Sequence, residues 1–139
     1  MDTTSFVAFL SYALAALLSV AFGAIYLVRS QFMPYHRDAL CLSWQQLDQH
    51  LHVVLIRLMR AAGGGLLATG ISTAVLALIL FPVGETWAQY AIPVIGLVAA
   101  VPSLYATILV RCRTLTRTPV AASAMAVGLL VLGFIFSLV

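Results

Sequence analysis

The sequence contains no lysine, very few charges of any kind and no acidic residue inside its long apolar runs. Only 8% of the 139 residues are charged, whereas ordinary globular domains carry roughly 25%. So few charges cannot cover a water-soluble surface. The four acidic residues lie outside the apolar runs: Asp2, Asp38, Asp48 and Glu85. Coupled transporters usually place an ionisable group within their spans, so this distribution argues against a proton- or ion-coupled pump.

Most signatures of catalysis are also missing. The sequence has no nucleophile–base pair, no Cys-x-x-Cys motif and no strand-like alternation of polar and apolar residues. The three glycines at 63–65 do not follow a strand, which excludes a nucleotide-binding loop. The two cysteines, Cys41 and Cys112, are both expected near the arginine-rich side, as reduced thiols. The sequence therefore leaves the cofactor unassigned.

Four apolar runs dominate what is present. They cover about residues 5–28, 61–81, 88–110 and 119–139. A membrane-spanning helix needs about 20 apolar residues, and backbone groups in lipid must be satisfied within the segment. The first run lacks a positive leader and is too long for a cleaved signal peptide, so we expect a retained helix. The sequence predicts an all-α integral membrane four-helix bundle that forms a single domain over residues 1–139.

The basic residues are segregated to alternate gaps between the runs. The second gap carries only Glu85 and the N-terminus only Asp2, whereas the first and third gaps carry all seven arginines: Arg29, Arg37, Arg57, Arg60, Arg111, Arg113 and Arg117. Cytoplasmic loops retain Lys and Arg. The pattern predicts a bacterial cytoplasmic (inner) membrane, with both termini outside. Because the arginines flank apolar runs and form no continuous basic face, we expect membrane lipid as the partner, and no nucleic acid.

A cytoplasmic amphipathic segment is predicted at about residues 43–60, before the second span. Ser43 and Gln46 have the spacing of a capping box, and Pro34 disfavours helix for Met33. We expect the helix to begin near Trp44 and to run without interruption into the second span. It forms an amphipathic interfacial extension of the bundle.

Small residues predict where helices pack closely. In the first span they recur every four residues, which places them on one helix face. The second span opens with glycines. The predicted packing residues are Ser11, Ala15, Ser19, Gly23, Gly65 and Ala68. These faces are candidates for contacts within the bundle, within a homo-oligomer or with a membrane partner subunit.

The mouth of the second span is the candidate ligand site. Arg57 and Arg60 are three residues apart on a helix, and such a pair can hold a carboxylate or a phosphate. Orientation in the membrane alone also explains them. The candidate set adds one histidine and the glycines that follow: Arg57, Arg60, His50, Gly63, Gly64 and Gly65. Local unwinding at these glycines would be the transporter interpretation.

The first gap also holds groups that can bind metal. His36, Cys41 and His50 are weak candidates. His50 and His52 are two residues apart on the expected helix and diverge, while the stretch around Cys41 is irregular. The pattern favours polar interfacial side chains, and no metal is predicted.

Two resemblances to known families carry further expectations. Phe32-Met33-Pro34-Tyr35-His36, Trp44-x-x-Leu47, the arginine–glycine stretch 60–65 and Glu85-Thr86-Trp87-Ala88 resemble the DoxX-like group of small bacterial four-span membrane proteins. That resemblance implies a bacterial inner membrane and supplies no activity.

The second resemblance is to the membrane-bound glutathione transferases of the MAPEG superfamily. The chain is similar in size, number of spans and the motif Arg57-x-x-Arg60-Ala61. The family motif continues with His, Asn and Glu, where this chain has Ala62, Gly64 and Leu67. The resemblance implies glutathione as the ligand of this arginine pair.

Together these patterns predict a non-enzymatic membrane component. We expect an accessory subunit, or a protein that binds lipid or a small hydrophobic molecule. A MAPEG-like glutathione transferase and a small oligomeric transporter are the alternatives.

Overall fold

A computed structural model describes residues 2–115 and 118–139, and every regular element in these two ranges is a helix. Four helices there are long and apolar enough to cross a membrane, namely α1 (Thr3–Val28), α3 (Gln49–Val75) with its π-helical continuation η2 (Leu76–Leu80), α4 (Thr86–Thr114) and α5 (Val120–Ser137). Two short elements lie between α1 and α3: the helix α2 (Pro34–Leu40) and the 3₁₀ turn η1 (Trp44–Gln46). The chain therefore has the helices of a multi-pass membrane protein, and the predicted all-α class is confirmed.

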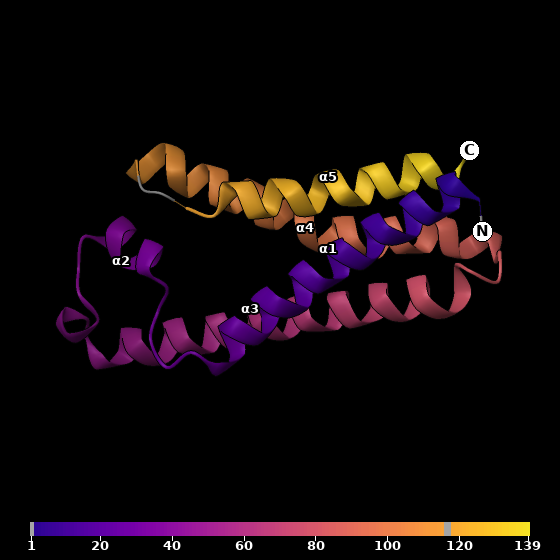
Figure 1. The fold of residues 1–139 in the computed structure, drawn as a ribbon. Coiled ribbons are helices and arrows are strands. Elements are labelled where there is room, and N and C mark those ends of the chain that lie inside the picture. The colour runs from indigo at the N-terminus through magenta and orange to yellow at the C-terminus, as the bar shows by residue number, and fades with distance from the viewer. Residues whose placement is uncertain (1, 116–117) are drawn as a thin grey trace.

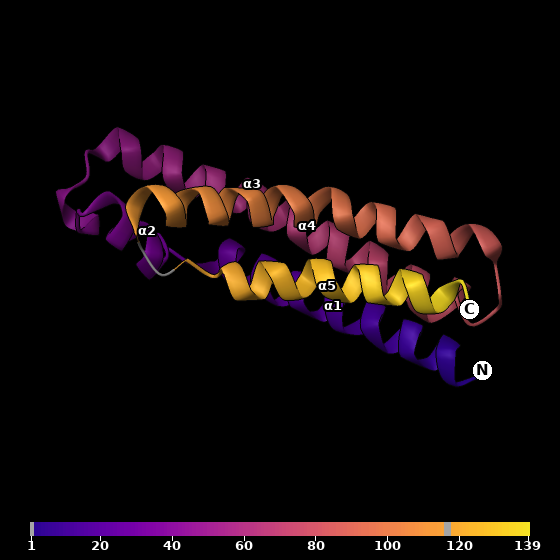
Figure 2. The same cartoon turned by 90° about the horizontal axis from the view of Figure 1, so that it is seen from above.

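The long helices run roughly along one another, and both chain termini lie at the same end of the molecule (Figure 1). We call this end, which includes the turn at residues 81–85, the terminal end. The opposite end, which holds α2, η1 and the last turn of α4, is the arginine end (Figures 1 and 2). Helix α1 packs mainly against α3 and α5, and α5 also packs against α4. Helices α3 and α4, although consecutive, contact each other much less.

The main apolar core lies at the terminal end. It joins α1, α4, α5 and η2, the continuation of α3, through the buried residues Ala8, Tyr12, Ala15, Ala77, Phe81, Ala88, Ile92 and Leu130. The rings of Tyr12 and Phe81 meet edge to face with centroids 5.8 Å apart, a favourable aromatic arrangement. The π-helical turn η2 carries Ala77 into this core, while the Phe81 N–H donates to the Leu76 carbonyl at 3.0 Å. The bundle is thus tied together where its chain ends and its tightest turn meet.

Glycines bring α1 and α3 into backbone contact. A Cβ built on Gly23 would lie 2.7 Å from the backbone nitrogen of Leu67, and one on Gly63 would lie 2.9 Å from the Gly23 carbonyl oxygen. Gly70 makes the same kind of contact, with its Cβ position 2.8 Å from the Val20 nitrogen. Small residues allow this approach. The close contact predicted for the second span therefore exists.

The residues that make this contact differ in part from those predicted. Ser11, Ala15 and Gly23 are buried and Ser19 is half-buried. Gly65 and Ala68, however, lie on the exposed face of α3, and a Cβ on Gly65 would meet nothing within 4 Å. The glycines turned toward α1 are Gly63 and Gly70. They are seven residues apart and share a helix face, whereas Gly65 is two positions from Gly63 and points elsewhere.

The expected uninterrupted helix from Trp44 is wrong. The capping box of Ser43 and Gln46 is present, and the Ser43 N–H donates to Gln46 Oε1 at 2.8 Å, but it closes only the short turn η1. Leu47 and Asp48 are extended, and α3 begins at Gln49 with the Asp48 carboxylate accepting from the His50 N–H at 2.9 Å. Asp is among the strongest N-cap residues, so the helix starts there.

Helix α3 and η2 together are longer than one membrane crossing requires. Their 32 residues span about 48 Å at 1.5 Å per residue, against about 30 Å of hydrocarbon. The charged residues, the glutamine and the histidines of α3 all lie in its first half, at the arginine end. A single crossing would fit the apolar second part of the helix, and Arg57 and Arg60 lie in the excess length at the arginine end.

Candidate functional site

The arginines of the described residues gather at the arginine end. Arg29 directly follows α1, Arg37 belongs to α2, and Arg57 and Arg60 lie in the first half of α3. Two more, Arg111 and Arg113, occupy the last turn of α4, where cations interact favourably with the helix dipole. Arg117 lies outside the described residues. All six described side chains are exposed, which gives this end a concentrated positive charge.

A small aromatic cluster folds the first loop back onto α1 and α3. Its buried members are Phe32, Met33, Leu47 and Met59, with Tyr26, Tyr35, Trp44 and Leu55 packed against them. The Phe32 and Trp44 rings meet at 5.1 Å between centroids. This second cluster, absent from the sequence-based predictions, turns a polar connection into an ordered surface.

Helix α2 is anchored to α1 by two tyrosines. The hydroxyls of Tyr26, near the end of α1, and Tyr35, in the first turn of α2, hydrogen-bond each other. Burial first, and the hydrogen bond with Tyr26 next, raise the pKa of Tyr35 above its usual 10.0. Burial likewise lowers the pKa of neighbouring His36 below its usual 6.5. Both side chains are therefore held in their neutral forms near neutral pH.

The Trp44 side chain is fixed by α3. Its ring stacks on the His52 imidazole with centroids 4.1 Å apart and planes 14° from parallel. His52 Nε2 donates to the Trp44 carbonyl across 2.6 Å. Trp44 is therefore held by its ring and by its backbone, as an anchor at headgroup depth would be.

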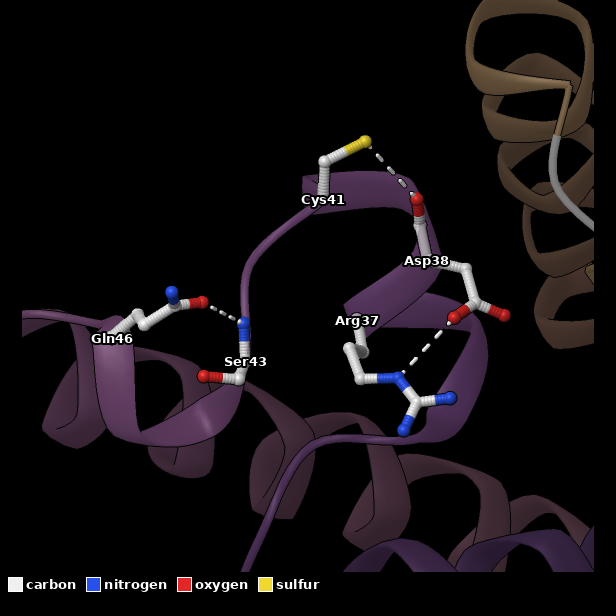
Figure 3. Close-up of polar contacts among 5 residues, drawn as sticks. All are labelled: Arg37, Asp38, Cys41, Ser43 and Gln46. Atoms are coloured by element: carbon white, nitrogen blue, oxygen red, sulfur yellow. Dashed lines mark hydrogen bonds and ion pairs between the residues drawn. The ribbon is translucent and has the colours of Figure 1, made fainter.

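The end of α2 turns the chain back toward η1 (Figure 3). Cys41 adopts a left-handed conformation with φ 53°, and its Sγ lies 3.7 Å from the Asp38 carbonyl oxygen. The Arg37 Nε lies 3.3 Å from Asp38 Oδ1, and both side chains are more than half exposed. This is the only ion pair within residues 2–115 and 118–139. An exposed pair of this kind contributes little stability, roughly 0–1 kcal/mol.

The loop borders an open cavity of about 500 Å³. It is bounded by the end of α1, the start of α2 and η1, and its lining residues are Val28, Arg29, Ser30, Gln31, Phe32, Pro34, Arg37, Ser43, Trp44 and Gln45. Its size falls within the range of small-molecule sites, roughly 300–1,000 Å³. Two arginines and an aromatic wall thus share one concave space. The clue in the sequence was Phe32, Tyr35 and Trp44 within a short loop flanked by arginines.

The predicted site at the mouth of the second span is only partly assembled. Arg57 and Arg60 do line one shallow groove of about 270 Å³, together with His52, Val53 and Ile56. The histidine in it is His52 rather than His50, whose ring is exposed and does not line the groove.

The predicted glycines do not line this groove. Gly63 packs on α1, while Gly64 and Gly65 would meet nothing within 4 Å if they carried a Cβ. Helix α3 is continuous through residues 63–65, so the local unwinding of the transporter interpretation is absent.

The weak metal candidates do not converge. His36 packs between Phe32 and Tyr35, whereas Cys41 is exposed at the end of α2 and His50 is exposed on α3. Across the described part of the chain, no three His, Cys, Asp or Glu side chains gather in a way that could hold a metal ion. Cys41 and Cys112 are both free and exposed.

No family model, no curated protein and no solved structure matches the chain. The function is therefore argued from the site alone.

Proposed function

We propose that the chain is a multi-pass protein of a bacterial cytoplasmic membrane that binds an anionic lipid or a small anionic hydrophobic molecule at its arginine end, without catalysing a reaction. One observation carries the proposal. Six exposed arginines surround one end of the bundle, and the only ion pair among the described residues is Arg37 with Asp38. Anionic headgroups supply the charge that this end lacks.

The groove at Arg57 and Arg60 supports an amphiphilic ligand. Its remaining walls are Val53, Ile56 and the His52 ring, so guanidinium groups border an apolar surface. A phosphate or carboxylate can bind the arginines while an acyl chain lies along α3. The arginine end would face the cytoplasm, as the distribution of arginine favours, and the termini would lie outside.

A melting experiment tests lipid binding. The purified chain in a neutral detergent is heated with added phosphatidylglycerol or phosphatidylcholine. Preferential binding to the folded state raises the melting temperature, so phosphatidylglycerol is expected to raise it more than phosphatidylcholine does. Equal shifts with both lipids would contradict the proposal.

A reporter experiment tests the orientation. A C-terminal fusion to a reporter that is active only in the cytoplasm should stay silent, and an active reporter would overturn the assignment. A fusion inserted within residues 41–43 should be active.

Glutathione transfer is the second candidate, because Arg57 and Arg60 do line one groove as that resemblance implies. It predicts that glutathione stabilises the protein and that Arg57→Gln removes the effect. The lipid-binding proposal predicts no shift with glutathione. The same melting assay therefore separates the two functions, while a flux assay in liposomes tests the transporter.

A further inference from the structure

The open cavity beside the first loop is separate from the groove at Arg57 and Arg60, since the two share no lining residue. Trp44, which lines the cavity, stacks on His52, which lines the groove. The cavity is also the larger of the two. It was not among the sites that the sequence predicted.

We propose that this cavity is a phosphate-binding site, in which Arg29 and Arg37 hold the phosphate group of a small anionic headgroup. The inference rests on the proposed function, since it names where the arginine end binds its anion and by which group. Two guanidinium groups from different elements can each contribute paired N–H donors to the oxygens of one phosphate.

The hydrogen bonds of these arginines leave donors available. Arg29 donates from Nη1 to the Met33 sulfur at 3.1 Å, and a thioether is a weak acceptor. Arg37 contacts its neighbour Asp38 through Nε, and the exposure of both side chains makes that pair weak. Figure 3 shows Arg37 and Ser43 on opposite sides of the turn that ends α2. Both residues line the cavity.

The cavity is preorganised by its surroundings. Phe32 is buried, Trp44 is stacked on His52, and the Tyr26–Tyr35 hydrogen bond fixes α2 relative to the end of α1. The elements that carry the two arginines are therefore already placed beside each other before a ligand arrives, which reduces the entropic cost of binding.

Its position favours a lipid headgroup as the source of the phosphate. Val28, the last residue of α1, lines the cavity beside Arg29, the first residue after it. Phe32, Pro34 and Trp44 add apolar walls. A phosphate bound here lies where the apolar span ends, so the glycerol and acyl parts of a phospholipid can continue along the apolar surface. Inorganic phosphate has the same charged group without this continuation.

Trp44 provides a direct readout. The chain has two tryptophans, and Trp87→Phe leaves Trp44, in the cavity wall, as the only one. In that background, the full chain in neutral detergent is titrated separately with short-chain phosphatidylglycerol, short-chain phosphatidylcholine and inorganic phosphate while Trp44 emission is recorded. Saturable change with phosphatidylglycerol, and weak change with phosphatidylcholine, is expected.

The variants separate the cavity from general charge attraction. Arg29→Gln and Arg37→Gln should each raise the half-saturating concentration about tenfold, the effect of losing one charge-assisted hydrogen bond. Arg113→Gln is the matched control, because it removes the same charge at the same end but outside the cavity. It should change the concentration by less than about twofold. Ser30→Leu fills the cavity without altering charge and should also weaken binding.

The possible results distinguish failure of the cavity site from failure of the proposed function. Equal weakening by Arg113→Gln and Arg37→Gln would overturn the cavity site. If phosphatidylglycerol raises the melting temperature of the wild type and of the Arg29→Gln/Arg37→Gln double variant alike, the cavity fails while the lipid-binding function stands. If it stabilises neither, the proposed function fails. Saturation by inorganic phosphate with the same arginine dependence supports the site and assigns it a soluble ligand instead of a lipid.

Discussion

The two ends of the molecule are held together in different ways. At the terminal end, α1, α4, α5 and the η2 continuation of α3 contribute buried residues to one apolar core. At the arginine end, the buried residues of the aromatic cluster come from the first loop and α3, with Tyr26 of α1 partly buried against them, while the buried residues of α4 stop at Gly96 and those of α5 begin at Leu130. The terminal end therefore holds the bundle, and the arginine end is a local structure built on one helix pair. This difference leaves the arginine end free to form binding surfaces.

The largest expected effect is on the stability of the whole bundle, which should depend on the terminal core and much less on the aromatic cluster at the arginine end. Tyr12→Ala removes a fully buried side chain from the core and should destabilise the whole bundle, by about 3–5 kcal/mol if it follows aromatic truncations in soluble cores. Phe32→Ala removes a buried ring from the other cluster and should chiefly release the loop. Unfolding in denaturing detergent measures the first effect, and hydrogen exchange at residues 30–47 measures the second. Equal global destabilisation by both would break the comparison.

The next largest effect is a difference in stability between substitutions on two faces of α3, one that contacts α1 and one that is exposed. Gly63→Ala places a methyl group 2.9 Å from the Gly23 carbonyl oxygen and 2.8 Å from Tyr26 Cβ, so α1 and α3 must separate slightly. Overpacking of this kind costs about 1–3 kcal/mol. Gly65→Ala meets open space and should be neutral, or stabilising by up to about 1 kcal/mol through helix propensity. Comparison of the two unfolding curves provides the test, and a larger loss for Gly65→Ala would point to a contact of that face outside this chain.

A smaller effect is expected at the start of α3. Asp48→Ala removes the carboxylate that accepts from the His50 N–H and should cost about 0.5–2 kcal/mol. Ser43→Ala is the control, because its capping box closes only η1. Amide exchange at residues 49–52 should quicken in the first variant and stay unchanged in the second. Slower exchange, or equal exchange in both, would place the helix start elsewhere.

The sequence was sufficient for the membrane helices but not for the first loop. Apolar length and the positions of the arginines predicted four helices, because lipid imposes those constraints on any chain. The boundary at Asp48 was missed because two capping patterns, at Ser43 and Asp48, compete within five residues, and tertiary packing decides between them. Gly63 and Gly70 pack against α1, whereas the sequence predicted Gly65. The difference depends on which face of α3 meets α1, and the partner helix sets that face.

The cavity could not be predicted for a related reason. Arg29 and Arg37 lie on separate elements, and their convergence depends on contacts between residues distant along the chain. Those contacts are the Tyr26–Tyr35 hydrogen bond and the packing of Trp44 on His52. Arg57 and Arg60 were recognised because they share a helix, where spacing alone places them together.

The smallest expected effect is the pH dependence of the stability of α2, which involves only the 7 residues of this helix. The pKa of Tyr35 is raised above 10.0, so the contribution of the neutral tyrosine is fully present below pH 10.0 and declines as the pH rises beyond it. The pKa of His36 is lowered below 6.5, so the neutral imidazole stabilises α2 above pH 6.5, and that contribution declines as the pH falls. Hydrogen exchange in α2, corrected for the intrinsic pH dependence, should therefore be slowest between these limits, while the terminal core stays unchanged. Tyr35→Phe should remove the alkaline limb and His36→Gln the acidic one. A change of the same size in the core amides would mean that the two ends unfold together, and the contrast between them would then be wrong.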